Sequence, residues 1–286
     1  MSEYEEYVQE YYEMLDEEAN TPALCKYAEI FLRNGKIVIE QEDSRVLLYR
    51  GQSDSRYLLE PSVFRKNLLH KEHSLIQDML LKAPDEFSNF HNPLERLIKM
   101  QHYGLPTRLL DVTTNPLVAL YFACNKDLDV DGEIIVFYDY IHRAYEINAQ
   151  CIVALTEYNG SSERQMLGFL SEKGFASPEL VQLTSITHIP IEVSQNNERI
   201  KRQHGAFIVA GLHGNNGSNS FQKSRFDLKP LLVRDFNDGL SRSIIIPKED
   251  KRRLLAELET FGINHGFLFP ELEHQAAYIK NKYEGE

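Results

Sequence analysis

Polar side chains that could bind or react with a ligand are concentrated in residues 101–124, QHYGLPTRLLDVTTNPLVALYFAC. The stretch then becomes almost wholly hydrophobic, which is typical of a buried segment. Buried groups that need hydrogen-bond partners lower stability unless each one is satisfied. These side chains therefore either close a loop on themselves or bind a ligand. They are Gln101, His102, Arg108, Asp111, Thr113, Thr114 and Asn115.

Part of this set has a structural explanation. Asn115 directly precedes Pro116 and can cap a helix that begins there. Arg108 and Asp111 are three residues apart and could form an ion pair. Capping and loop closure account less well for Gln101, His102, Arg108 and Asp111, so a ligand site stays open as the alternative.

A second group, Tyr49-Arg50-Gly51-Gln52, follows the hydrophobic run of a predicted strand. The guanidinium of Arg50 is suited to binding a phosphate or a carboxylate. Gly51 would allow a ligand to approach the backbone closely. The alternative is that Arg50 pairs with a nearby Asp and that Gly51 supplies a turn.

Two further segments could contribute to a site. Residues 198–207, ERIKRQHGAF, are basic, and Arg199, Arg202 and Gln203 are candidates for substrate binding or simply for a basic entry to a strand. Glu271 and Glu273 follow Pro270 in FLFPELE. A carboxylate there could be catalytic, or it could favour the N-terminus of the last helix.

Several common chemistries lack their motifs. The sequence has no Walker loop, no GxGxxG and no GxSxG elbow. His70 and His73 have no acidic or histidine partner in a recognisable metal spacing, so we expect no metal site. Cys25, Cys124 and Cys151 are far apart, which disfavours disulfides and fits a reducing compartment.

Charge and hydropathy argue against two classes of protein, those that coat nucleic acid and those that span a membrane. The net charge of −12 argues against a protein that coats nucleic acid through a broadly basic face. A membrane span is not expected, because no run of about 18 apolar residues occurs. The N-terminus is acidic and lacks an apolar signal core, so we expect a cytoplasmic protein with no membrane partner.

The elements that must position these residues alternate irregularly, which predicts an α+β fold. Residues 1–20 carry eight acidic side chains and no Lys or Arg, and they predict an amphipathic helix that is either solvated or a docking surface for a partner. A loop rich in Gly, Asn and Ser is expected over 211–220. We expect helices over 73–83, 93–104, 116–125, 248–262 and 271–283, and strands over 45–50, 132–140, 149–158, part of 197–210, and 241–247.

The motifs YRGQSDSRYLLEPSVFR and QHYGLPTRLLDVTTNPLVALYFA together resemble the FRG domain, a bacterial family named for a Phe-Arg-Gly signature. Tyr49 replaces the Phe, and Val112 stands where many members carry Trp. The segments RIKRQHGAF and IIIPKEDKRRLLAELETFGINHGFLFPEL extend the resemblance over roughly residues 45–275. The acidic N-terminal segment, taken as residues 1–40, falls outside this resemblance. Residues 41–286 are expected to form an FRG domain with a C-terminal extension.

A weaker resemblance is to ADP-ribosyltransferases, in which a first strand ending in Arg grips NAD, a second strand carries Ser or Thr, and a later Glu orients the nicotinamide ribose. It implies a mixed or antiparallel sheet with flanking helices and NAD as co-substrate. Arg50 would be catalytic together with Glu271, with Asp111 as the rival carboxylate. The implied cofactor-binding residues are Tyr49, Gly51, Gln52, Thr113, Thr114, Arg108 and His102.

The resemblance leads to the expectation of an NAD-dependent ADP-ribosyltransferase-like enzyme, in the setting of a bacterial toxin–antitoxin or phage-defence system. The acceptor would be a protein or a nucleic acid, bound near Arg199, Arg202 and Gln203, and an antitoxin or chaperone could dock on the acidic N-terminal helix. One alternative is a binding module that recognises a nucleotide or nucleic acid without chemistry. Another is a nuclease that uses Asp111, His102 and Arg108.

Overall fold

The computed structural model describes residues 22–42, 44–90, 92–160, 163–176, 188–194, 197–211 and 242–284. The fold is α+β, as predicted, with a seven-stranded mixed sheet in the order β4-β5-β6-β2-β1-β3-β7. Neighbouring strands are antiparallel except for β4 and β5, which are parallel. The strands are β1 Val46–Gln52, β2 Leu109–Thr113, β3 Gly132–Asp139, β4 His142–Arg143, β5 His188–Glu192, β6 Gly205–Ala210 and β7 Ser243–Ile246.

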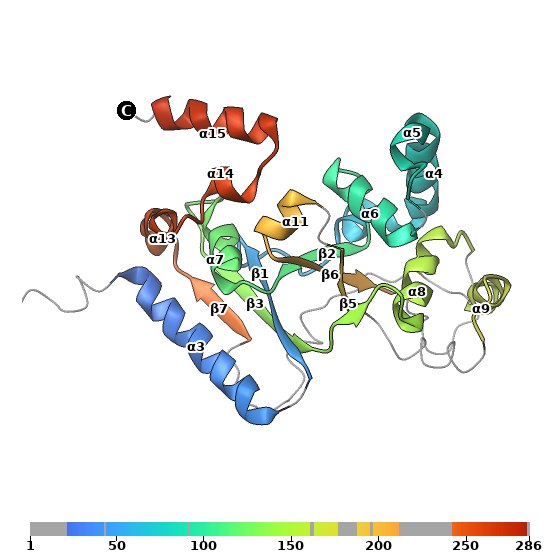
Figure 1. The fold of residues 1–286 in the computed structure, drawn as a ribbon, viewed down its shortest axis with the longest axis horizontal. Helices are drawn as coiled ribbons and strands as arrows, with labels where there is room; N and C mark the ends of the chain where they lie inside the picture. The colour runs from blue at the N-terminus through green and yellow to red at the C-terminus, as the bar shows by residue number, and fades with distance from the viewer. Residues whose placement is uncertain are drawn as a thin grey trace, which may run out of the picture.

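The helices pack mainly against one face of the sheet (Figure 1). The α-helices are α3 Ala23–Gln41, α4 Glu72–Lys82, α5 Pro84–Phe87, α6 Pro93–His102, α7 Pro116–Cys124, α8 Ile147–Ala154, α9 Glu163–Glu172, α11 Glu198–Arg202, α13 Lys248–Thr260, α14 His265–Leu268 and α15 Leu272–Glu284. Short 3-10 helices are η1 Ser62–Asn67, η2 Leu69–Lys71 and η3 Leu155–Glu157.

Two hydrophobic clusters divide the helix-bearing face. One joins α3, α7 and α13 to β1, β3 and β7, and the other joins α4, α6 and α8 to β2, β5 and β6. The strands supply alternate residues to this face, as a pleated sheet requires. Asp111 and Thr113 therefore share the face with Leu109, in the interval between the two clusters. Helix α11 lies in the same interval (Figure 1).

The seam between β1 and β2 has the fewest paired residues of any two neighbouring strands in the sheet. The two strands register only at Tyr49 and Thr113, whereas β1 pairs with β3 along its whole length and β2 pairs likewise with β6. The strands therefore separate on one side of that pair. Backbone groups of β2 near Asp111 are left available to a side chain or a ligand.

Helix α3 is part of the folded body. Tyr27 and Phe31 are buried, and the ring of Phe31 meets that of Tyr49 edge to face at 5.9 Å. The carboxylate of Glu257 accepts hydrogen bonds from the first backbone N–H groups of α3, at 2.9 and 2.6 Å. The second part of the segment that we predicted over 1–40 thus packs on the sheet from residue 23 onward, while residues 1–21 lie outside the described residues.

One strand prediction was wrong, and another was wrong only over its first residues. Residues 149–158 form the end of α8 and η3 instead, because a short run that is apolar all round fits a buried helix as well as a buried strand. The basic residues at 198–202 form α11 before β6 begins at Gly205, with Asn197 as the N-cap. All of the predicted loop over 211–220 except Gly211 lies outside the described residues.

Candidate functional site

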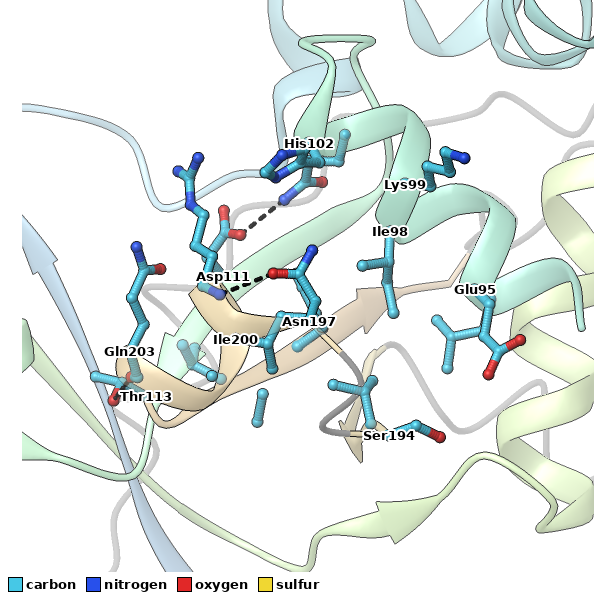
Figure 2. A pocket seen from close by; sticks show the side chains of 18 of the residues that line it. Glu95, Ile98, Lys99, His102, Asp111, Thr113, Ser194, Asn197, Ile200 and Gln203 are labelled. Atoms are coloured by element: carbon cyan, nitrogen blue, oxygen red, sulfur yellow. Dashed lines mark hydrogen bonds between the residues drawn. The ribbon is translucent and has the colours of Figure 1, made fainter. Parts of the chain in front are cut away.

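A cleft of about 650 Å³ lies between α6 and α11, with β1, β2 and β6 as its floor (Figure 2). Its size is in the range of small-molecule sites. One wall carries Glu95, Ile98, Lys99 and His102 from α6. The opposite wall carries Asn197, Arg199, Ile200 and Gln203, and the floor includes Tyr49, Arg50, Gly51, Asp111 and Thr113.

Arg50 lies in the seam between β1 and β2. Its Nη1 donates to the main-chain carbonyl of Asp111 at 2.6 Å, so it spans the gap between the separated strands. Its Nε is buried and has no hydrogen-bond partner among the described residues. Burial lowers the pKa of the Arg50 guanidinium, and the nearby Asp111 carboxylate acts in the opposite direction. An arginine nevertheless stays charged, so the seam contains a buried donor without a partner among the described residues.

The Asp111 carboxylate is held by a short relay of hydrogen bonds. Gln101 Nε2 donates to Asp111 Oδ1 at 2.9 Å, and the Thr107 hydroxyl donates to Gln101 Oε1. Because Thr107 occupies the amide oxygen, the amide nitrogen must face Asp111. Gln101 and Thr107 thereby orient a carboxylate that is exposed in the cleft.

Glu271 reaches the same region from the C-terminal part of the chain. Its Oε1 lies 3.4 Å from His102 Nε2 and 3.8 Å from Arg199 Nη1, and both of these residues line the cleft. Its Oε2 is buried without a hydrogen-bond partner among the described residues. Burial lowers the pKa of His102, and the charge of Arg199 lowers it further, while Glu271 acts in the opposite direction. The lowered pKa favours a neutral imidazole.

Thr113 and Gln203 join the floor to the wall. The Thr113 hydroxyl donates to the main-chain carbonyl of Gln203 at 2.6 Å, and Gln203 Nε2 donates to the carbonyl of Leu268 at 3.0 Å. Asn115 caps α7 by accepting from the N–H of Leu117 at 3.0 Å, as predicted. The two bonds of Gln203, to Thr113 and to Leu268, fix the end of α11 relative to β2 and α14.

The site predictions separate into two groups. Eight of the predicted residues line the cleft: Tyr49, Arg50, Gly51, His102, Asp111, Thr113, Arg199 and Gln203. Gln52, Thr114, Arg108 and Arg202 are not among its lining residues, and Glu271 reaches it through His102 and Arg199. Lys99 and Asn197 line the cleft although neither was named from the sequence, and so does Gln101, which was named only as part of the polar stretch. Gln101 could be found from its place in the polar stretch. Asn197 could be found from its type, because an Asn followed by a Glu is a common start of a helix.

Arg108 is buried away from the cleft. The pairing with Asp111 that its spacing suggested was wrong: the guanidinium is fully buried and forms a two-point ion pair with Glu72, with Nε at 2.8 Å from Oε1. It also donates to the carbonyls of Leu155 and Ala210 at 3.3 and 3.4 Å. Glu72 lies far away in the sequence, so local spacing could not reveal it.

Residues 45–132 match the family model of the FRG domain. The match covers β1, β2 and α7, and with them the seam and most of the floor of the cleft. No curated protein and no solved structure matches the chain. Among the described residues there is no group of three or more His, Cys, Asp or Glu that could hold a metal ion, and no helix long and apolar enough to cross a membrane.

The glycine of the FRG motif serves packing. A Cβ on Gly51 would collide with the main-chain carbonyl of Ala119 and lie 2.7 Å from the backbone nitrogen of Ala123. Helix α7 can therefore approach β1 only where the strand has no side chain. Gly51 borders the cleft, but this contact alone is enough to require glycine, so the ligand approach that the sequence suggested is not needed to explain it.

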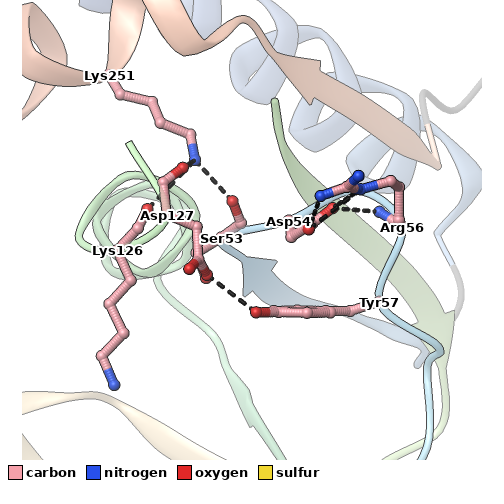
Figure 3. Close-up of polar contacts among 7 residues, drawn as sticks. All are labelled: Ser53, Asp54, Arg56, Tyr57, Lys126, Asp127 and Lys251. Carbon is pink, nitrogen blue, oxygen red and sulfur yellow. Dashed lines mark hydrogen bonds and ion pairs between the residues drawn. The ribbon is translucent and has the colours of Figure 1, made fainter. Parts of the chain in front are cut away.

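The loop that follows Gly51 is held by a lysine from outside the matched segment (Figure 3). Lys251 of α13 is fully buried, and its Nζ donates to the carbonyls of Ser53, Asp127 and Lys126 at 2.6, 2.9 and 3.3 Å. The Asp127 carboxylate accepts from Ser53 Oγ at 2.5 Å and from Tyr57 Oη at 3.1 Å. We refer to Ser53, Tyr57, Asp127 and Lys251 as the Lys251 cluster. It fixes the loop that follows Arg50 and Gly51.

Proposed function

We propose that the cleft binds NAD and that the protein is an ADP-ribosyltransferase-like enzyme. The observation that supports this most is that Glu271 lies beside His102 and Arg199, which line the same cleft as Arg50. Such a cleft offers the guanidinium of Arg50 for a pyrophosphate and carboxylates for a developing positive charge.

The reaction would use these groups in a simple order. The bond between C1′ of the ribose and the nicotinamide nitrogen breaks, and the electron pair leaves with the nicotinamide, which becomes neutral. The positive charge that develops on the ribose is stabilised by a carboxylate, for which Glu271 and Asp111 are the two candidates. An acceptor oxygen or nitrogen then bonds to C1′ and loses its proton to that carboxylate or to neutral His102.

Release of nicotinamide from NAD tests the proposal. The full chain is incubated with NAD and cell extract as acceptor, and nicotinamide is measured by chromatography. Loss of a group that stabilises transition-state charge typically lowers turnover by about 10²–10³-fold, which we expect for Glu271→Gln. The matched control is Glu249→Gln, because Glu249 is exposed on α13.

The outcomes also assign the carboxylate. If Asp111→Asn abolishes turnover while Glu271→Gln does not, Asp111 takes the role given to Glu271. Wild-type protein that releases no nicotinamide, with and without extract, would refute the enzyme.

A non-catalytic nucleotide-binding module is the second candidate. It is favoured by the internal bonds of the two central groups: Arg50 donates to the Asp111 carbonyl, and the Asp111 carboxylate accepts from Gln101. In this case NAD should raise the melting temperature through its binding alone. No nicotinamide would accompany that stabilisation.

A further inference from the structure

Four rings and planar groups are stacked behind one wall of the cleft. Phe269 is buried, and the ring of His265 stacks on it with centroids 4.6 Å apart and an interplanar angle of 26°. The ring of Tyr278 lies nearly parallel to that of His265, at 6.4 Å and 14°. The fourth member is Arg199, whose guanidinium carbon lies over the Phe269 ring at 4.7 Å.

Hydrogen bonds at its far end hold this column in place. Tyr278 Oη donates to Glu259 at 2.8 Å. Gln275 Nε2 donates to the carbonyls of Gly266 and Phe269 at 2.5 and 2.7 Å, which ties α15 to α14. The column is therefore a rigid support, and it ends at a cleft-lining residue.

Arg199 is thus constrained on two sides. The buried ring of Phe269 lies against its guanidinium, and Glu271 Oε1 lies 3.8 Å from Nη1. Arg199 lines the cleft and its side chain is 30% exposed, so part of it is accessible to a ligand there. A guanidinium supported in this way by an aromatic ring can stack on a second planar group.

We infer that the open face of Arg199 is a stacking site for the planar heteroaromatic ring of a nucleotide. The inference rests on the proposed function, since it assumes that the cleft takes a nucleotide. A phosphate would instead bind the edge of the guanidinium, where Glu271 already competes. Adenine and nicotinamide share the required chemistry, and the experiment distinguishes them.

The test compares ligands with and without a ring. Binding of AMP, nicotinamide mononucleotide and ribose 5-phosphate to the full chain is measured by calorimetry. Arg199→Lys keeps the positive charge but removes the plane, so it should raise the Kd of one ring-bearing ligand by roughly fivefold to tenfold. Its effect on ribose 5-phosphate should stay within about twofold, since a lysine also binds phosphate.

Two further variants complete the design. Arg252→Lys is the control, because Arg252 is exposed on α13. Phe269→Leu removes the support, so it should weaken the same ring-bearing ligand, with its melting temperature recorded because Phe269 also packs on Phe122. If the variants weaken AMP, the ring that stacks on Arg199 is adenine. If they weaken nicotinamide mononucleotide, it is nicotinamide.

The result can separate this inference from the proposed function. Equal weakening of all three ligands by Arg199→Lys would show that Arg199 binds phosphate and would overturn the stacking site, as would no change in any of them. If the wild type releases nicotinamide but Arg199→Lys binds AMP and nicotinamide mononucleotide as the wild type does, the proposed enzyme is supported and the stacking site is not. Ring-specific weakening without nicotinamide release leaves the stack in a binding module.

Discussion

The Lys251 cluster and the cleft both contain buried polar groups, but they satisfy them differently. In the Lys251 cluster the ammonium group has three carbonyl acceptors, and the Asp127 carboxylate has two hydroxyl donors. In the cleft, Arg50 Nε and Glu271 Oε2 are buried without partners among the described residues. The buried pair of Arg108 and Glu72 belongs with the first kind.

Buried polar atoms without a partner among the described residues also occur away from the cleft, at Gln52, Arg96 and Asn148. Arg50 and Glu271 differ from these because they lie at the lining of the cleft or directly beside it. An unpaired buried donor or acceptor lowers stability by about 1–3 kcal/mol. Such atoms persist in folded proteins mainly where another requirement keeps them, and binding of a ligand is the common one. Removing a residue from the satisfied kind should therefore reduce stability, whereas changes in the cleft should act mainly on binding and turnover.

The largest expected effect is at Arg108. Arg108→Met leaves the Glu72 carboxylate buried without its cation, and we expect a loss of about 3–5 kcal/mol in the free energy of unfolding. Denaturant titration of the variant against the wild type measures it. The double variant Arg108→Met/Glu72→Leu should recover much of the loss, because two apolar groups can replace a buried ion pair. A loss under about 1 kcal/mol in the single variant would show that the ion pair of Arg108 with Glu72 does not stabilise the fold as proposed.

A smaller loss is expected at Lys251. Lys251→Met removes a charged donor from the carbonyls of Ser53, Lys126 and Asp127, which should lower the free energy of unfolding by about 2–3 kcal/mol. The control, Lys248→Met, changes an exposed lysine on the same helix and should stay within about 0.5 kcal/mol.

The loss of stability at Lys251 is to be compared with the loss at Glu271, beside the cleft. Glu271→Gln, measured in the same denaturant titration, should lose less stability than Lys251→Met. Equal losses would mean that the two regions do not differ in the way their polar groups are satisfied.

The sequence predicted the framework well because local signals dominate there. The strand at 46–52 and the helices that begin at Pro93 and Pro116 follow from hydrophobic pattern and from caps such as Asn115. The seam residues Arg50, Asp111 and Thr113 were recognised because they lie in compact motifs. The helix at 147–154 was missed because an apolar run carries no period that separates helix from strand.

The rest depends on contacts between distant parts of the chain. Glu72 with Arg108, and Lys251 with Ser53, are joined by tertiary packing that no local spacing encodes. The same holds for Phe269 beneath Arg199. Glu271 was proposed from resemblance, and its position beside His102 could not be derived from a spacing of more than 150 residues.

The smallest expected effect is a pH dependence at the column behind the cleft. Burial, followed by the charges of His274 and Arg199, lowers the pKa of His265 below its ordinary value of 6.5, while Glu271 opposes the shift. As the pH falls below about 6.5, the unfolded chain binds a proton that the folded protein resists. The folded state should therefore lose stability on the acid side of this value.

His265→Phe isolates this contribution, because phenylalanine keeps a flat ring against Phe269 and Tyr278 but cannot be protonated. Melting temperatures between pH 7 and pH 5 should fall less steeply for this variant than for the wild type. His102, whose pKa is also lowered, is present in both proteins and cancels in the difference. Parallel curves would show that His265 takes up its proton freely in the folded state. The column would then be open to solvent and could not be the rigid support that distinguishes this wall of the cleft.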